Sequence, residues 1–183
     1  MPDVDEAPLR ETAAGLAVQG DGWFVLNARD AVWVEREGFG TRCSFETNGR
    51  VAASLGLHPY LFPQLGLNLA LLEPGQRSTL YHAETGQEDF LVLEGECVAI
   101  VEDEERRLKA WDLLHCPPGT RHAFANDGEA PCVLLMVGAR REDGGIVYPV
   151  SELAGRYGAS VQQETTSPHE AYAPYAHWDV VES

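Results

Sequence analysis

Short runs of β-branched, aromatic and aliphatic residues recur along this chain, punctuated by Gly, Pro, Asn and Asp at intervals of about ten residues. This spacing is typical of a β-sandwich or β-barrel, so the fold class is predicted to be all-β. Helical patterns are few, and short helices are predicted over Val150–Tyr157, with Ser151 as the N-cap, and over Pro168–Tyr172. The predicted strands are Trp23–Leu26, Ala31–Glu35, Thr41–Glu46, Leu67–Leu72, Thr79–Ala83, Phe90–Leu93, Cys97–Val101, Leu113–Cys116, His122–Ala125 and Cys132–Val137.

The length of 183 residues fits one domain with extensions. With 44% apolar and 23% charged residues, the composition is that of a globular protein with a core and not of a disordered chain. The two terminal segments have a mixed polar composition and no sustained period. We therefore predict an N-terminal extension over residues 1–20, a β-barrel over residues 21–140 and a C-terminal extension over residues 141–183.

The chain is strongly acidic, with 29 Asp and Glu residues against 13 Lys and Arg and a net charge of −16. Such a chain repels phosphate backbones and anionic lipid, so neither nucleic acid nor membrane is expected as a partner. No run of about 18 apolar residues is present that would cross a membrane. The first residues carry carboxylates instead of a basic segment followed by an apolar run, so a cytoplasmic location is expected. The acidic run Glu102–Glu105 is interpreted as the solvated tip of a hairpin.

Four cysteines, Cys43, Cys97, Cys116 and Cys132, form no CxxC pair and lie mostly inside apolar runs. Cysteines in such surroundings are typical of buried thiols. We therefore expect reduced, buried side chains and neither a disulfide framework nor a zinc site made of thiolates.

The segment 75–95 contains His82, Glu84 and Glu88 within a few residues of one another. Side chains two apart on an extended strand project from the same face, so His82 and Glu84 are expected to point together. Glu88 follows a Thr-Gly turn and can fold back beside them. One imidazole and one or two carboxylates form a plausible half of a divalent-metal site.

A second segment, 111–126, contains the run Pro117–Asn126, in which a Pro-Pro-Gly turn precedes His122. The turn has a fixed conformation, so His122 enters the following strand at a defined height. A single histidine between apolar residues is more often a satisfied core residue than a metal ligand. The metal hypothesis therefore depends on His122 meeting the ligands of the first segment.

Together these two segments resemble the cupin superfamily. Its first motif runs glycine, five residues, His-x-His, three or four residues, Glu, six residues and Gly, and Glu88 and Gly95 keep the last spacing. Its second motif is matched by Pro117, Gly119, His122 and Asn126. The departures are Glu84 in place of the second histidine, six residues between Gly75 and His82, and Trp111 in place of a glycine.

The resemblance implies a double-stranded β-helix, or jelly-roll barrel, that holds one divalent ion inside its mouth. Carried over by position, the ligands are His82, Glu88 and His122, with Glu84 as a possible fourth. Two imidazoles and one carboxylate are similar to the facial triad of non-haem iron enzymes. The ligand set leaves Fe, Mn and Zn open, and a closed four-ligand zinc site would instead be structural.

Three readings of the function, from different classes, follow. The first is a metal-dependent small-molecule enzyme, an oxidoreductase of the dioxygenase type or an isomerase, in which Glu84 or Tyr81 transfers a proton. The second is a non-catalytic cupin that binds a carbohydrate or another metabolite, and a structural or partner-docking β domain is a third reading. Only Arg77 and Arg121 lie close in sequence to the motifs, which favours oxygen or neutral-substrate chemistry.

Some expectations concern the surroundings of the site and the assembly. Tyr60, Tyr81, Trp111 and His115 are candidates to line the mouth of the barrel, although aromatic residues more often fill the interior of such a fold. The early strands between residues 23 and 46 can add to the sheet of a second copy. We therefore expect a homodimer.

Overall fold

A computed structural model describes residues 3–181, so the first two residues of the predicted N-terminal extension and the last two of the C-terminal extension lie outside the described residues. The predicted all-β class is confirmed, because strands dominate and the helices are short. Among the described residues, no helix has the length and apolar character needed to cross a membrane. The elements are β1 (Leu9–Thr12), β2 (Gly15–Val18), β3 (Trp33–Arg36), β4 (Gly40–Ser44), α1 (Gly49–Leu55), β5 (Leu65–Leu72), β6 (Ala83–Glu84), β7 (Glu88–Glu94), β8 (Glu96–Val101), β9 (Glu104–Lys109), β10 (Leu113–Cys116), β11 (His122–Ala125), β12 (Cys132–Ala139), β13 (Ile146–Val147), α2 (Glu152–Arg156), α3 (Pro168–Ala171) and β14 (Asp179–Val180).

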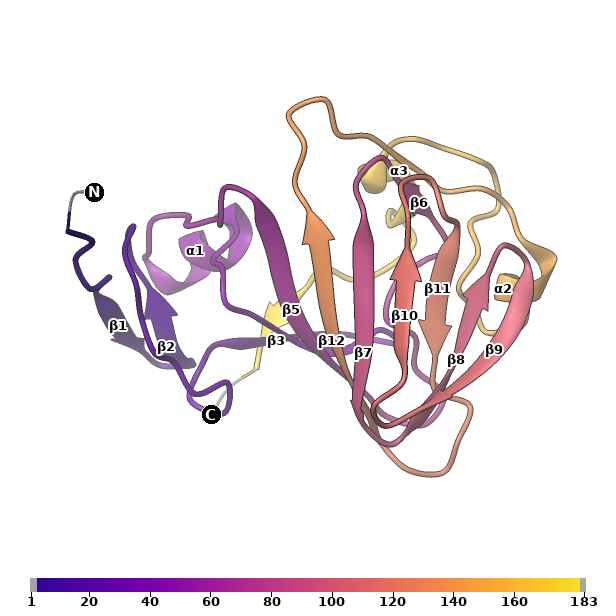
Figure 1. Ribbon diagram of the computed structural model, residues 1–183, viewed down its shortest axis with the longest axis horizontal. Helices are drawn as coiled ribbons and strands as arrows, with labels where there is room; N and C mark the ends of the chain where they lie inside the picture. The colour runs from indigo at the N-terminus through magenta and orange to yellow at the C-terminus, as the bar shows by residue number, and fades with distance from the viewer. Residues whose placement is uncertain (1–2, 182–183) are drawn as a thin grey trace.

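Two sheets enclose the main core. The larger has seven strands in the order β10-β7-β12-β5-β4-β3-β14, and the smaller has three in the order β11-β8-β9 (Figure 1). Alternate residues of the facing strands point between the sheets, as expected for half-buried strands. This core contains Ala70, Leu72, Phe90, Val92, Cys97, Ala99, Cys116, Phe124, Cys132, Leu134 and Met136.

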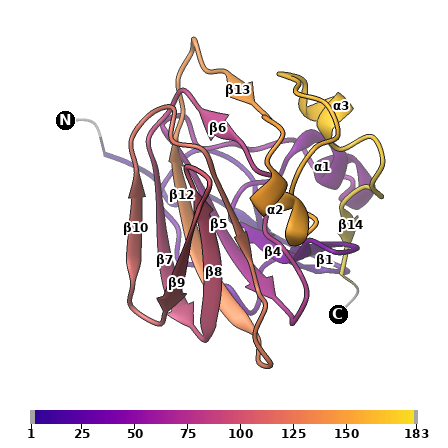
Figure 2. The ribbon, with the colours of Figure 1, turned by 90° about the vertical axis from the view of Figure 1, so that its right-hand side faces the viewer.

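A less regular segment, residues 76–82, extends the smaller sheet along the free edge of β11. The amide of Ser78 donates to the carbonyl of Phe124 at 2.9 Å, and His82 and His122 form an isolated antiparallel bridge. The chain then enters β6, which pairs with β13 at the top of the view in Figure 2. Residues 76–84 therefore lead from the edge of the smaller sheet to the pair formed by β6 and β13.

Both predicted extensions contain ordered structure. The β1–β2 hairpin of the predicted N-terminal extension lies at one end of the molecule, together with α1, which falls within the range predicted for the barrel (Figure 1). Helix α1 begins after Asn48, whose side chain accepts a hydrogen bond from the amide of Val51, and ends at Gly56 with a φ of +64°. The C-terminal segment returns to this end, where β14 pairs with β3 and Trp178 packs against the same apolar cluster as α1.

The strand predictions hold for the barrel and fail at two places. Trp23–Leu26 is predicted as a strand but makes only a single bridge, between Glu6 and Trp23, and Val25 is 81% exposed. Thr79–Ala83 is also wrong as a regular strand, since only His82 and Ala83 pair with other segments. The hairpin of residues 9–18 and the helix of residues 49–55 were not predicted.

The remaining local predictions are mostly confirmed. Helix α2 begins after Ser151, whose hydroxyl accepts a hydrogen bond from the amide of Ala154, and α3 begins at Pro168. The acidic run forms a hairpin tip only at Glu102 and Asp103, because the next two glutamates already belong to β9.

All four cysteines are free and buried, as predicted. Burial raises the pKa of Cys43 to about 11 and that of Cys116 to about 12, so neither is a thiolate near neutral pH. Because the thiolate is the reactive form, we expect none of the four to react with Ellman's reagent within minutes at pH 8 in the native protein. All four should react at once in guanidinium chloride. Rapid labelling of the native protein would contradict the buried positions.

Candidate metal centre

Three strands of the barrel bring the predicted metal ligands together. His82 lies directly before β6, Glu88 begins β7 and His122 begins β11. The backbones of the two histidines pair reciprocally, since the amide of His82 donates to the carbonyl of His122 at 3.1 Å and the reverse bond is 2.8 Å. The relative height of the two imidazoles is therefore set by the backbone.

The donor atoms of His82, Glu88 and His122 converge, and these three residues are called the metal group below. One ligand atom from each lies within 4.8 Å of the other two. Donors held at about 2.1 Å from one ion would lie no more than about 4.2 Å apart. Binding of one ion would therefore draw the three donors closer together.

Both imidazoles present the same nitrogen to this space. His82 Nδ1 lies 2.7 Å from the carbonyl of Leu80, and His122 Nδ1 lies 3.0 Å from the carbonyl of Thr120. A carbonyl only accepts, so each Nδ1 carries the proton and each Nε2 is left with a lone pair. Such a backbone bond to the outer nitrogen is the usual arrangement of a metal-ligating histidine.

Charge at the site also favours a cation. Burial, together with the neighbouring His122, lowers the pKa of His82 to about 3, and burial lowers that of His122. Burial and the neighbouring Glu84 raise the pKa of Glu88 to about 8. The 3.6 Å approach of His122 Nε2 to Glu88 Oε2 is therefore a contact between neutral groups and not an ion pair. A divalent ion would let Glu88 ionise and would bind both neutral imidazoles.

Glu84 lies beside this group without belonging to it. One carboxylate oxygen is 3.9 Å from His82 Nε2, and the side chain is 39% exposed, against 13% for Glu88. Burial raises the pKa of Glu84, and the charge of Arg140 opposes that shift. His82 and Glu84 do line the same cavity, as the spacing predicts, with Glu84 on its more open side.

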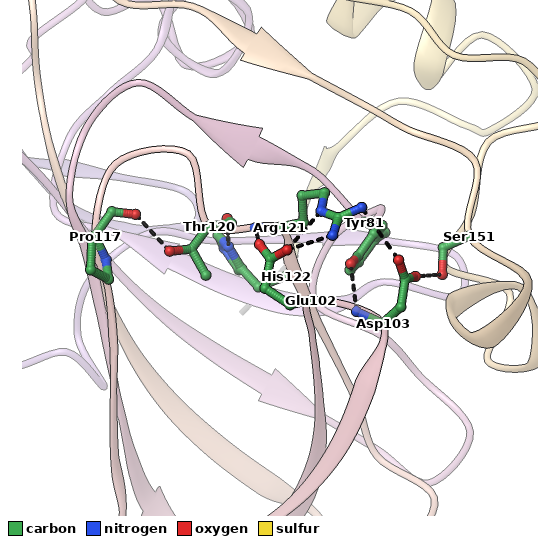
Figure 3. A network of polar contacts seen from close by, with 8 residues as sticks. All are labelled: Tyr81, Glu102, Asp103, Pro117, Thr120, Arg121, His122 and Ser151. Carbon is green, nitrogen blue, oxygen red and sulfur yellow. Dashed lines mark hydrogen bonds and ion pairs between the residues drawn. The ribbon is translucent and has the colours of Figure 1, made fainter.

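A network of polar contacts holds the loop that carries His122 (Figure 3). The Thr120 hydroxyl donates to the carbonyl of Pro117 at 2.8 Å, and Arg121 pairs with Glu102 and with Asp103. Because these contacts fix the residues on either side of the Thr120 carbonyl, they also fix the ring of His122.

Tyr81 does not reach the metal group, contrary to the predicted catalytic role. Its side chain is fully buried in an apolar cluster that includes Ala154 of α2. Its hydroxyl accepts a hydrogen bond from the amide of Asp103 at 2.9 Å (Figure 3). Adjacent residues of an extended segment point to opposite sides, so Tyr81 points away when His82 points inward. The other predicted mouth residues, Tyr60, Trp111 and His115, are also absent from the cavity lining.

His115 and Trp111 lie on the outside of the barrel. His115 Nδ1 is 2.7 Å from Asp89 Oδ1 on the outer face of β10 and β7, and Trp111 is 77% exposed. Leu114 and Cys116 take the inward positions of β10 instead.

A cavity of about 250 Å³ opens beside the metal group. Phe90 and Met136 form part of an apolar wall. The arginines on its wall are Arg42, from β4, and Arg140, directly after β12. Neither Arg77 nor Arg121 lines the cavity. The expectation, drawn from proximity in sequence, that these two are the arginines nearest the site was therefore wrong. Pairing of β4 and β12 with β5 brings residues distant in sequence to one wall.

Comparison with known families matches residues 68–138 to the model described as cupin domain. An uncharacterized protein of Methanocaldococcus jannaschii, MJ1618, is 28% identical over 81 residues, which cover 43% of this chain and 65% of that protein.

Two solved structures are also similar. A sugar phosphate isomerase of the cupin superfamily from Silicibacter pomeroyi is 31% identical over 60% of this chain and 64% of its own, with a TM-score of 0.45. A predicted oxalate decarboxylase from Thermotoga maritima is 20% identical over 64% of this chain and 100% of its own, with a TM-score of 0.50. The second likeness concerns the fold alone.

Proposed function

Because this chain contains a cupin domain, we propose that it binds one divalent metal ion through His82, Glu88 and His122 and is a metal-dependent enzyme acting on a small molecule. The observation that carries the proposal is the convergence of two neutral imidazoles and one carboxyl on a shared space, with each Nδ1 held by a backbone carbonyl. Two nitrogen donors and one oxygen donor suit Fe, Mn or Zn.

The residues around this group would have different roles in the reaction. When bound, an ion with open coordination positions supplies Lewis-acid or redox chemistry. Glu84, beside His82 and partly exposed, is placed to accept or donate a proton at its carboxylate. Phe90 packs against the His122 ring with centroids 4.8 Å apart and covers that side of the ring with an apolar surface.

The reaction classes that fit are oxidation and isomerisation, since both use an ion with exchangeable positions beside a proton-transfer group. A purely binding role would need neither an ion nor Glu84. We therefore place the enzyme first and treat non-catalytic binding of a small ligand as the result of a failed metal test.

The test is elemental analysis of the protein purified without chelator and without nickel affinity resin. We expect close to one equivalent of Fe, Mn or Zn per chain, and its loss in a His82→Ala/His122→Ala double variant. His115→Ala is the matched control, because this histidine pairs with Asp89 on the outer face and should leave the metal content unchanged.

The result has clear alternatives. Absence of metal from the wild-type protein, even after incubation with each of the three ions, would overturn the proposal. Equal metal content in the double variant would show that the ion binds elsewhere in the protein.

A further inference from the structure

We infer that the small molecule bound in this cavity carries an anionic oxygen group, a carboxylate or a phosphate, and that Arg42 binds it with help from the hydroxyls of Ser78 and Thr79. The inference deepens the proposed function and depends on it for the other end of the ligand, which would face His82, Glu88 and His122. The anion subsite itself is argued from residues outside the metal group.

Arg42 is a cation without a carboxylate partner in the described part of the chain. Its Nη2 donates to the carbonyl of Ser78 at 3.0 Å, and its buried Nε has no hydrogen-bond partner. The other cavity arginine, Arg140, is different, because its Nη2 lies 2.7 Å from both oxygens of Glu46. Arg42 is therefore the arginine of this wall whose charge is left for a ligand.

The residues next to Arg42 add unused donors. Ser78 and Thr79 line the same cavity, and their hydroxyl oxygens are buried without a hydrogen-bond partner among residues 3–181. A buried polar group without a partner destabilises the folded chain, because it has lost its hydrogen bonds to water and gained none in return. Three adjacent groups in that condition are explained if an anion accepts their hydrogen bonds.

The position of Arg42 is fixed from the outside of the cavity. Its guanidinium lies over the ring of Trp178, with Cζ 4.9 Å from the ring centroid, and the Arg36 guanidinium lies over the same ring at 4.9 Å. Stacking on an aromatic ring leaves the edge of a guanidinium free to donate. Trp178 therefore orients Arg42 without neutralising it.

Cavity size limits the ligand. A volume of about 250 Å³ lies below the range of about 300–1,000 Å³ typical of pockets for drug-sized molecules. The substrate class is therefore a small organic acid or a small phosphorylated compound.

The test measures binding of two probes, inorganic phosphate and malonate, by isothermal titration calorimetry to metal-loaded and chelator-treated protein. We expect one of the two to bind and Arg42→Gln to weaken that binding by about 10- to 100-fold, as expected for loss of charge-assisted hydrogen bonds. Which probe binds distinguishes a phosphate from a carboxylate ligand.

Two further variants separate binding from folding. Arg36→Gln removes the other guanidinium on Trp178, which does not line the cavity, and should leave anion binding unchanged. Ser78→Ala removes a buried hydroxyl that has no partner, so it should leave stability equal or higher while it weakens anion binding several-fold.

Metal content, measured on the same samples, keeps the two proposals apart. Retained metal with anion binding unaffected by Arg42→Gln would overturn the anion subsite and leave the metal proposal intact. Failure of both probes to bind the wild-type protein would also overturn it. Binding to the chelator-treated protein that Arg42→Gln abolishes would support the subsite even where no metal is found.

Discussion

Replacing Glu88 with glutamine is expected to weaken divalent-metal binding by at least about 100-fold, because residues that merely orient ligands already contribute about 10- to 100-fold. Glutamine keeps the size of the side chain and removes the anionic oxygen that the ion would need. Titration of the metal-free variant with Mn, Fe and Zn measures the loss. Asp89→Asn, on the outer face of the same strand, is the control and should bind as the wild type does.

The same substitution should have the opposite effect on the metal-free fold. Glu88 has a pKa of about 8 in the folded chain, against an ordinary value of 4.5, so between these two values the folded state holds a proton that the unfolded state releases. Stability of the metal-free wild type should therefore fall as pH rises from about 4.5 to about 8.

Glutamine does not titrate, so the variant should lack this loss. Its advantage over the wild type in free energy of unfolding should grow by a few kcal/mol between pH 5 and pH 9. Urea unfolding in the presence of chelator measures it. An advantage that shrinks with rising pH would show that Glu88 is not held in its neutral form.

Gly95→Ala is expected to cause the largest loss of stability among single substitutions of the barrel turns. Gly95 has a φ of +74°, and a Cβ placed there would lie 2.2 Å from the carbonyl oxygen of Pro131. The turn between β7 and β8 would have to move, since the obstacle is backbone and cannot rotate away. We expect a loss of more than about 3 kcal/mol, or failure to fold.

Gly75→Ala is the matched control for backbone conformation. Its φ of +83° is similar, but nothing lies within 4 Å of the added Cβ. This variant should lose only about 1–2 kcal/mol, the cost of a left-handed conformation in an L-residue. Comparable losses in the two variants would mean that the Pro131 contact contributes nothing.

The sequence was most informative where local spacing alone determines position. The second motif predicted His122 inside a strand, and Asn126 closes the next turn by donating to the carbonyls of Leu72 and Ala130 at 2.8 Å each. Likewise, the two-residue spacing of His82 and Glu84 predicted their shared cavity. The same alternation, applied one residue earlier, would have turned Tyr81 away from the site.

What the sequence did not reveal depends on pairing between distant strands. Arg42 and Arg140 reach the cavity because β4 and β12 both flank β5, a neighbourhood that no local pattern specifies. One signal was available in the sequence: Arg42 stands in a predicted strand beside Cys43. A charged residue is seldom buried, so an arginine in such a strand was a candidate for a functional role. The β1–β2 hairpin and α1 were missed because their stability comes from tertiary contacts around Trp178 and Val180.

The reciprocal backbone bonds between His82 and His122 have a consequence for how such a barrel diverges. Each histidine contributes to the sheet through its amide and carbonyl and to the site through its ring. A mutation at either position can therefore remove a donor without removing the two hydrogen bonds that join the segments. Descendants of this chain can therefore change the donor set of the cavity while they keep the same architecture.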